Sequence, residues 1–310
     1  MAEKGYRNPV EQLEAVVKAR RFMGVCLMEA HRFKEALQQH LEALDVCNNT
    51  PQLEEERTYA LCNIGVTRLE QAERLSDEDV KKRVLNDSIK YLDESIVAAN
   101  RMSDVPSHSS GSSSRRREWL KCNMVVDAYN NIGLAYDVLS EPKQAIESLN
   151  KALEMHSATF GRDDAYLARR SDMPSEERQE CLERRSKLYS AIGLGIMHMH
   201  QGDLSTAEGY LRADVSISSS LKFSKDYGKA YINLGNVLMR KREFAKALEE
   251  YRLAVSVSSQ FKDSDVQALA NEKAANAKRA ILLDKTAQSG LGRPTLPVVV
   301  RVFCVCVSAR

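Results

Sequence analysis

Asparagine side chains recur at matching places in this sequence and are its best candidates for chemistry. Asn63, Asn131 and Asn233 each precede a glycine by two residues, in the strings Asn-Ile-Gly, Asn-Ile-Gly and Asn-Leu-Gly. A carboxamide both donates and accepts hydrogen bonds, so a row of them can hold the main chain of an extended peptide without reading its side chains. Four further polar residues are predicted to share this surface: Asp127, Asn130, Tyr231 and Asn236.

Two plainer interpretations of these residues stay open at the level of sequence. Asparagine is a common polar residue on half-exposed helix faces. Asp127 could pair with a lysine or arginine of a basic peptide, and it could equally be a solvated helix charge. The repeated phase of the three asparagines favours the peptide-binding interpretation.

The seven cysteines and six histidines form no catalytic or metal-binding pattern. Cys304 and Cys306 are separated by one residue, without the paired Cys and His spacing of a zinc site. His198 and His200 lie two residues apart in a predicted helix, so they point in different directions. No phosphate-binding loop, H-E-x-x-H motif or G-x-S-x-G motif is present. The sequence therefore predicts a protein that is not an enzyme and holds no metal or cofactor.

The composition indicates a helical protein. Only 14 glycines and 7 prolines occur among 310 residues, aromatic residues are 6% of the chain, and 28% of residues are charged. This length predicts two domains or one repeat array. The formal net charge of +2 argues against sequence-specific nucleic-acid binding. No apolar run suits a membrane, residues 1–10 lack a secretion signal, and the cysteines suit a reducing compartment, either nucleus or cytoplasm.

A glycine and a small residue twelve positions later recur four times along the chain. A large residue follows four positions after the small one, and a further residue, usually small, three positions after that. This spacing is typical of two antiparallel helices whose backbones approach closely at the two small residues. The copies are Gly24, Ala36, His40, Ala43; Gly133, Ala145, Leu149, Ala152; Gly195, Ala207, Leu211, Asp214; and Gly235, Ala247, Tyr251, Ala254.

A fifth copy begins at Gly65, but its Ser88 follows the glycine by 23 residues, so about eleven residues are inserted. Each hairpin would expose an apolar face unless its neighbours stacked on it. We therefore predict an all-α, right-handed tetratricopeptide-repeat superhelix over residues 1–288. The predicted array has five hairpins, linkers near 103–117 and 160–178, and a capping helix over 264–286. Residues 289–310 are predicted to be an irregular, apolar and disordered tail.

The first helices of the hairpins are predicted to line a concave groove. If the glycine is numbered eight within its repeat, position six points into the groove and is Phe22, Asn63, Asn131, Gly193 or Asn233. Three of these five residues are asparagines, which defines the predicted ladder of amides.

Two segments carry a resemblance to a known family. Residues 119–133, with Trp119 and the string Asp-Ala-Tyr-Asn-Asn-Ile-Gly, resemble an entry to the amino-terminal repeats of plant Tonsoku and animal Tonsoku-like proteins. So does the string Gly-Lys-Ala-Tyr-Ile-Asn-Leu-Gly at 228–235. The resemblance covers residues 20–285 and includes the long second repeat. By this resemblance the chain looks like a partial or truncated member, since it starts at what looks like the family's second repeat and lacks the leucine-rich or ankyrin repeats expected to follow.

The resemblance implies a nuclear scaffold at replication forks whose repeats bind a newly deposited core histone. It suggests Asp127, Asn131, Tyr231 and Asn233 as contacts of a histone tail, and other replication-repair proteins as partners. The same short strings occur in spindle and polarity adaptors of the Pins type, so such an adaptor is the alternative. A third alternative is an inert, truncated product.

Overall fold

The computed structural model describes residues 9–102, 111–171, 173–199, 202–221 and 226–288. Within these ranges the regular structure is helical throughout, and ten of the helices pair into five antiparallel hairpins. The hairpins are α1 (Pro9–Glu29) with α2 (Phe33–Asn48), α3 (Glu54–Ala72) with α4 (Glu78–Arg101), α5 (Gly111–Val138) with α6 (Pro142–Phe160), α8 (Ser175–His198) with α9 (Leu204–Ser220), and α10 (Tyr227–Arg240) with α11 (Phe244–Phe261). The remaining elements are the short η1 (Pro51–Leu53), α7 (Asp164–Ala168) and the final α12 (Ser264–Gln288).

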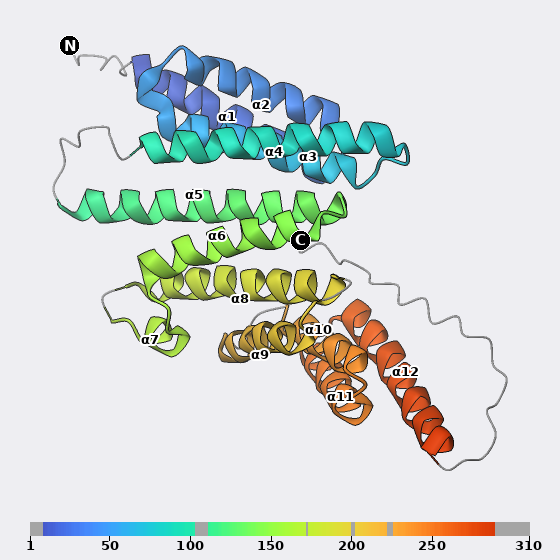
Figure 1. Ribbon diagram of the computed structural model, residues 1–310. Helices are drawn as coiled ribbons and strands as arrows, with labels where there is room; N and C mark the ends of the chain where they lie inside the picture. The colour runs from blue at the N-terminus through green and yellow to red at the C-terminus, as the bar shows by residue number, and fades with distance from the viewer. Residues whose placement is uncertain (1–8, 103–110, 172, 200–201, 222–225, 289–310) are drawn as a thin grey trace.

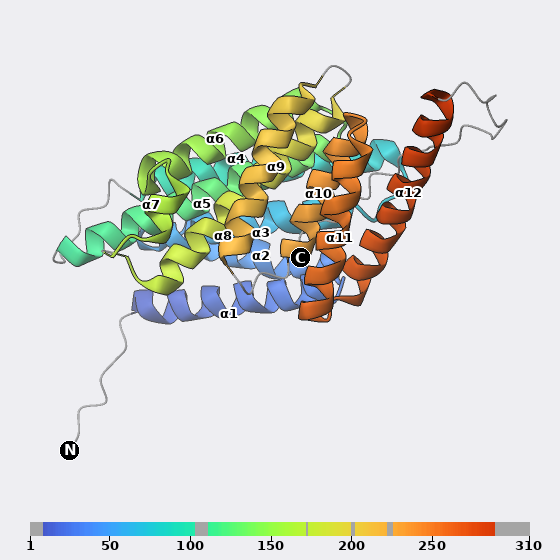
Figure 2. The same cartoon turned by 90° about the horizontal axis from the view of Figure 1, so that it is seen from below.

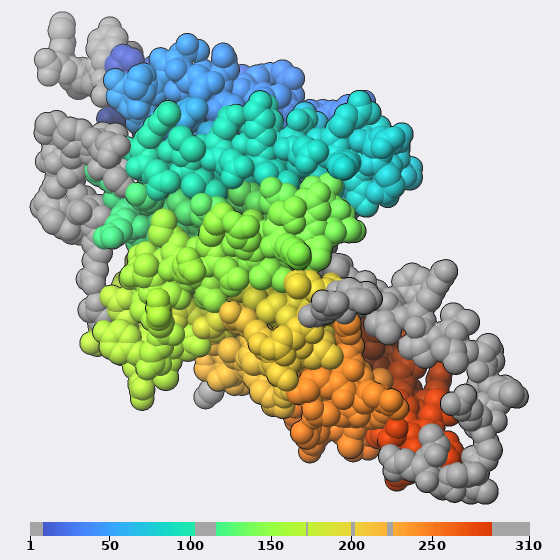
Figure 3. Space-filling view, viewed as in Figure 1, coloured from blue at the N-terminus to red at the C-terminus, as the bar shows by residue number. Residues whose placement is uncertain are grey.

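The hairpins stack in chain order to form a solenoid (Figure 1). The second helix of each hairpin packs on the first helix of the next, as α2 does on α3 and α9 on α10. First helices also contact one another directly, α1 with α3, α3 with α5, and α8 with α10. On the face shown in Figure 3 the colours follow one another along the molecule, in agreement with helix contacts that join neighbouring repeats. We call the surface formed by α1, α3, α5, α8 and α10 the A face.

Close packing at the glycines holds each hairpin together. A Cβ atom added to Gly133 would lie 2.7 Å from Cγ of Leu149 and 3.3 Å from the carbonyl oxygen of Ala145. At Gly65, the added atom would lie 2.6 Å from Cγ of Leu92 and 3.2 Å from the carbonyl oxygen of Ser88. The predicted pairing of glycine with a small and a large residue is confirmed at both places. Most of the eleven inserted residues lengthen α4, which has 24 residues. The helix therefore begins at Glu78, well before Ser88 and Leu92, the residues that pack on Gly65 of α3.

The predicted register of the fourth hairpin is wrong by two residues. Gly193 lies under Leu211 and the carbonyl oxygen of Ala207, where the sequence pattern had placed Gly195. Gly195 instead faces Ile146 of α6, in the preceding hairpin. The distance from glycine to Ala207 is therefore fourteen residues rather than twelve, because the turn between α8 and α9 is longer. With Gly193 as position eight, position six of this repeat is Ala191.

Three hairpins share one turn geometry. His31, Ser140 and Arg242 each lie seven residues after the glycine of their repeat and adopt left-handed φ angles of 59°, 61° and 64°. The next amide closes the turn by donating to a carbonyl five residues earlier, as Glu141 N does to Tyr136 O at 2.9 Å. This is the Schellman pattern that ends helices. The turns are therefore fixed by backbone hydrogen bonds even though no glycine occupies the left-handed position.

The segment predicted as a second linker is anchored by one buried arginine. Arg185 of α8 is fully buried and donates to Asp164 Oδ1 at 2.8 Å and to the carbonyl oxygen of Gly161. It also donates to Nδ1 of His156, whose pKa burial and the neighbouring arginines lower to about 3. Helix α7 and its flanking turns are thereby tied to α6 and α8.

Helix α5 begins at Gly111, inside the stretch 103–117 that was predicted as a linker, and residues 103–110 lie outside the described residues. The helix predicted over 264–286 is α12, which buries Val266, Ala270 and Ala277 against the last hairpin. The predicted tail, 289–310, also lies outside the described residues.

Two glycine substitutions should change stability in opposite directions. Gly133→Ala should lower the free energy of unfolding by about 1–3 kcal/mol, because the new methyl group overlaps Leu149. Gly209 lies exposed on α9 with nothing within 4 Å of an added Cβ, so Gly209→Ala should raise it by about 0.5–1 kcal/mol. Urea denaturation of both variants checks the pair, and equal effects would contradict the packing described above.

A substitution at His40 should stabilise the first hairpin. The His40 side chain is fully buried opposite Gly24, where the other repeats have leucine or tyrosine. Neither ring nitrogen has a hydrogen-bond partner among the described residues, and burial together with Arg21 lowers the pKa of His40 to about 4. His40→Leu should raise the free energy of unfolding at pH 7 by about 1–3 kcal/mol.

The pH dependence provides a second check on His40. An imidazole with an ordinary pKa near 6.5 when unfolded and about 4 when folded binds protons preferentially in the unfolded chain. The wild-type protein should therefore lose stability as the pH falls from 7 toward 4. In His40→Leu this loss should be smaller, and an unchanged slope in urea titrations would contradict the assignment.

Candidate functional site

The seven predicted site residues lie on α3, α5 and α10, all of which contribute to the A face. The structure separates them into two groups according to whether their polar atoms already have partners. The first group is the three amides of Asn63, Asn130 and Asn131 on α3 and α5, which have no hydrogen-bond partner among the described residues. Asp127, also on α5, is already paired with Arg184. The second group, on α10, makes hydrogen bonds within the protein.

Three amides on α3 and α5 are available for binding. Asn63 and Asn131 occupy the same position in consecutive repeats, and Asn130 lies beside Asn131. All three side chains are half-buried, and none has a hydrogen-bond partner in the part of the chain that the structure describes. Six side-chain N–H donors and three carbonyl acceptors are thus held on two adjacent helices.

Asp127 lies about one helical turn before Asn131 and is already part of an ion pair. Arg184 of α8 donates to both carboxylate oxygens, with Nε 3.0 Å from Oδ1 and Nη2 3.3 Å from Oδ2. Glu180 also accepts a hydrogen bond from Arg184, at 2.7 Å. The Asp127 side chain is nevertheless 46% exposed, whereas that of Arg184 is 19% exposed. A cation from a ligand can therefore reach the carboxylate, but it has to share it with Arg184.

An equivalent ion pair lies at the start of the array. Lys18 occupies the place in repeat one that Asp127 occupies in repeat three, and its Nζ lies 3.7 Å from Oε1 of Glu56. Glu56 also pairs with Arg21, whose guanidinium lies 4.1 Å from the centre of the Tyr59 ring. In both pairs a residue six positions before the packing glycine of one repeat meets an opposite charge nine positions before the glycine of the next, a spacing that could have revealed them. The sequence interpretation missed Glu56 and Arg184 because it considered each repeat alone.

The asparagines of α10 are used internally. The Asn233 amide donates to Oγ of Ser190 on α8 at 3.1 Å. Asn236 Oδ1 accepts a hydrogen bond from the hydroxyl of Tyr251 at 2.9 Å. Tyr251 is the large residue of the same hairpin, and this bond gives its hydroxyl a partner. Tyr231 and Tyr227 share a hydrogen bond of 3.0 Å between their hydroxyl groups. Burial and this contact raise the pKa of Tyr231.

A buried carboxylate lies behind Asn233. Asp214 of α9 is 4% exposed and occupies the position that is alanine or serine in the other repeats. It accepts hydrogen bonds from the hydroxyls of Ser186, Ser190 and Ser218, while burial raises its pKa to about 6. Because Ser190 also accepts from Asn233, the network links α9 through α8 to α10. With Gly193 as the packing glycine, Ala191 takes the position at which the ladder predicted an amide. Ser190, the residue before it, holds the Asn233 amide of the next repeat.

The predicted ladder is therefore shorter than expected. Tyr129, Tyr189 and Tyr231 each precede the packing glycine of their repeat by four residues, a spacing that would have identified Gly193 from sequence. With that register, repeat four contributes Ala191 instead of an amide. The free amides are confined to repeats two and three.

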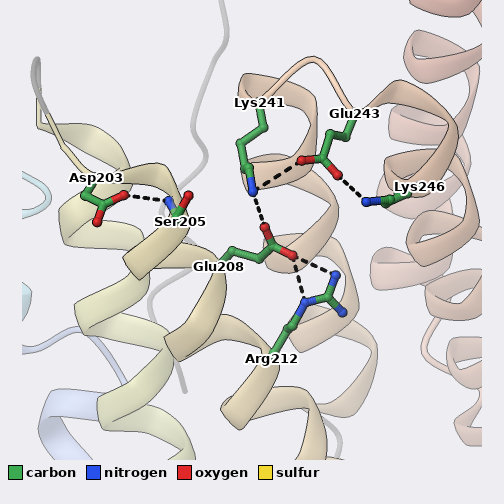
Figure 4. A network of polar contacts seen from close by, with 7 residues as sticks. All are labelled: Asp203, Ser205, Glu208, Arg212, Lys241, Glu243 and Lys246. Atoms are coloured by element: carbon green, nitrogen blue, oxygen red, sulfur yellow. Dashed lines mark hydrogen bonds and ion pairs between the residues drawn. The ribbon is translucent and has the colours of Figure 1, made fainter.

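Polar contacts on the edge of the solenoid fix the fourth hairpin to the fifth (Figure 4). Glu208 of α9 accepts from Lys241 at 2.5 Å and from Arg212 at 2.8 Å. Lys241 lies in the turn after α10 and also pairs with Glu243 at 3.2 Å. The charged groups of these side chains are paired with one another, so the contacts stabilise the packing of the fourth hairpin on the fifth.

Over the described ranges, no three His, Cys, Asp or Glu side chains come together in a way that could hold a metal ion. Among those same residues, no helix combines the length and apolar character needed to cross a bilayer.

Comparisons with known proteins agree on the fold. A family model for the tetratricopeptide repeat matches residues 126–158 and 228–261. No curated protein matches the sequence. A Podosopora anserina protein with nearly identical TPR-like repeats of the kinesin light chain kind is 12% identical, with a TM-score of 0.50 over 79% of this chain and 96% of that one.

Weaker matches include the TPR2AB domain of yeast Sti1 in complex with an HSP90 peptide. That chain is 13% identical with a TM-score of 0.31, over 86% of this chain and 99% of that one. BtubC of P. vanneervenii is 14% identical with a TM-score of 0.36, over 94% of this chain and 96% of that one.

The fold and the A face thus define an all-α tetratricopeptide-repeat superhelix, as the sequence predicted. The family match covers the third and fifth hairpins, and the structure adds the other three. Repeats of this class are typical of protein–protein interaction scaffolds. The Tonsoku-like assignment is not confirmed by these comparisons.

Replacing Asp214 should change the pH dependence of stability. A pKa of about 6 in the folded state, above the ordinary value of 3.8, means that the folded protein holds this proton more tightly. The stabilising contribution is fully present below pH 4 and is lost as the pH rises through 6. Asp214→Asn stays neutral, so its stability relative to wild type should increase between pH 5 and pH 7.5. A constant difference across that range in urea titrations would contradict the assignment.

Proposed function

We propose that the A face of repeats two and three binds an extended peptide, specifically the basic tail of a core histone. The observation that carries this proposal is the cluster of three unpartnered amides, Asn63, Asn130 and Asn131, beside the half-exposed carboxylate of Asp127. Amides on adjacent helices can pair with successive peptide groups of an extended chain. The carboxylate adds attraction for lysine or arginine.

The choice of a histone tail rests on charge and on resemblance. A histone tail is extended, rich in lysine and arginine, and supplies the free peptide groups that the amides require. The likeness of residues 119–133 and 228–235 to the Tonsoku-like repeats supports a nuclear scaffold in replication-coupled repair and chromatin maintenance. Within this proposal Tyr231, Asn233 and Asn236 support the fold of the last repeat, because their polar atoms already have partners inside the protein.

Substitution of the free amides tests the site. Each amide hydrogen bond contributes about 0.5–1.5 kcal/mol, so the double variant Asn63→Ala with Asn131→Ala should weaken binding about fivefold to a hundredfold. Fluorescence anisotropy with unmodified H3 and H4 tail peptides measures the change. The matched control is Asn271→Ala, on the exposed side of α12 and away from the amide cluster.

Two results would contradict the proposal. One is the absence of binding to either tail at peptide concentrations up to about 1 mM, since that limit corresponds to only about 4 kcal/mol of binding free energy. The other is binding that the double variant leaves unchanged. Capture of spindle or polarity factors from nuclear extract, without histones, would favour the adaptor alternative.

A further inference from the structure

The long second hairpin forms a pocket with the turn of the first hairpin. In the first, third and fifth hairpins the chain reverses seven residues after the packing glycine. Helix α3 instead continues to Ala72, and the turn that follows holds Arg74 and Leu75, nine and ten residues after Gly65. Figure 2 shows this turn, in cyan, reaching past the end of α1. The pocket has a volume of about 380 Å³, and its walls include His31, Phe33 and Lys34 from the first hairpin and Arg74 and Leu75 from the second.

Positive charge exceeds negative charge around this pocket. Three cationic side chains, Arg32, Lys34 and Arg74, line it together with one carboxylate, that of Glu35. Arg32 takes up this carboxylate with two parallel hydrogen bonds, of which the one from Nε to Oε1 measures 2.7 Å. Lys34 and Arg74 have no acidic partner among the described residues. The pocket therefore holds two positive charges that no carboxylate of the described chain neutralises.

The Arg74 guanidinium is held by contacts that leave most of its donors free. Its Nη2 lies 3.2 Å from Nε2 of His31 and donates to it, because a guanidinium has five N–H donors and no acceptor. The same group lies 5.8 Å from the centre of the Phe33 ring, within reach of a cation–π contact. His31 is fixed in turn by the closed turn in which it adopts its left-handed φ of 59°. The remaining N–H groups of Arg74 can bind an anion.

A phosphate monoester matches this pocket better than a carboxylate does. Near pH 7 a phosphate monoester carries a charge of about −1.5 to −2, which balances the two unneutralised cations, whereas a carboxylate balances only one. The planar guanidinium of Arg74 can bind two phosphate oxygens at once, and the ammonium of Lys34 adds a point charge. Phe33 and Leu75 are half-buried apolar walls suited to the stem of a side chain that bears the phosphate.

We propose that this pocket binds a phosphorylated side chain of a partner protein. Its volume falls within the range of small-ligand sites, about 300–1,000 Å³, so a phosphate with its side chain fits it better than a free phosphate ion. Gln71, which also lines the pocket, lies eight residues after Asn63 on α3, about 12 Å along the helix axis. The pocket is thus separate from the amide cluster, and the proposal does not depend on peptide binding there.

Isothermal titration calorimetry of the full-length chain with N-acetyl-phosphotyrosine amide tests the proposal. Saturable binding with a Kd of about 1 mM or tighter is expected. Arg74→Ala and Lys34→Ala should each weaken it about tenfold to a hundredfold, because each removes a charged hydrogen-bond donor. Both residues are exposed, so the far-ultraviolet circular dichroism should not change. The matched control is Arg252→Ala, exposed on α11, which should bind as wild type does.

Two results in this series would overturn the proposal. One is the absence of binding at probe concentrations up to about 10 mM, and the other is an affinity that neither Arg74→Ala nor Lys34→Ala changes. The double variant Asn63→Ala with Asn131→Ala should bind the probe as wild type does, so failure of the phosphate site and failure of the amide site can be told apart.

Related anions test the chemistry of the ligand. The sulfotyrosine analogue has nearly the same shape but a single negative charge, so it should bind about tenfold more weakly or worse. Inorganic phosphate should also bind more weakly, because it makes no contact with Phe33 and Leu75. Equal affinity for the sulfate analogue would contradict the charge argument. Equal affinity for inorganic phosphate would contradict a side chain as the ligand.

Discussion

The close approach of two helix backbones inside each hairpin is the constraint on which this structure depends. It requires a glycine on the first helix and a small residue with a large neighbour on the second. At Gly24, Gly65, Gly133, Gly193 and Gly235 an added methyl group would overlap the side chain opposite. Because protein interiors are close-packed, that overlap could not be relieved without moving a helix. The spacing of hairpins along the solenoid follows from this contact, repeated five times.

The stacking that follows explains why the first helices together form the A face. Each second helix packs on the first helix of the next repeat, so equivalent positions of α3, α5 and α8 face the same way. Ion pairs then join these helices across the repeat boundaries, as Asp127 does with Arg184 and Lys18 does with Glu56. The amides between the two ion pairs are left without partners. Among the predicted site residues of the A face, the unsatisfied amides therefore lie on α3 and α5.

The fourth repeat departs from the others in a consistent way. Its longer turn shifts the packing glycine to Gly193, and Asp214 takes the place of a small residue. A buried carboxylate needs donors, which Ser186, Ser190 and Ser218 provide. Ser190 then holds Asn233, so the amide of repeat five is not available to a ligand. One substitution in the core thus changes the chemistry of the surface of the following repeat.

Spacing along the chain was enough to predict the helical hairpins, their number, the inserted residues in the second repeat and the final helix. These features rest on spacings within about forty residues, where the helical period ties sequence position directly to a face. Which asparagines lack a partner depends on how neighbouring repeats pack. Asn63 and Asn131 are unpartnered while Asn233 is not, although all three sit in nearly the same string. The difference depends on side chains of the adjacent repeat, such as Ser190, which lies 43 residues before Asn233. No local pattern reports such a contact, because it forms only when two separately folded hairpins are brought into register.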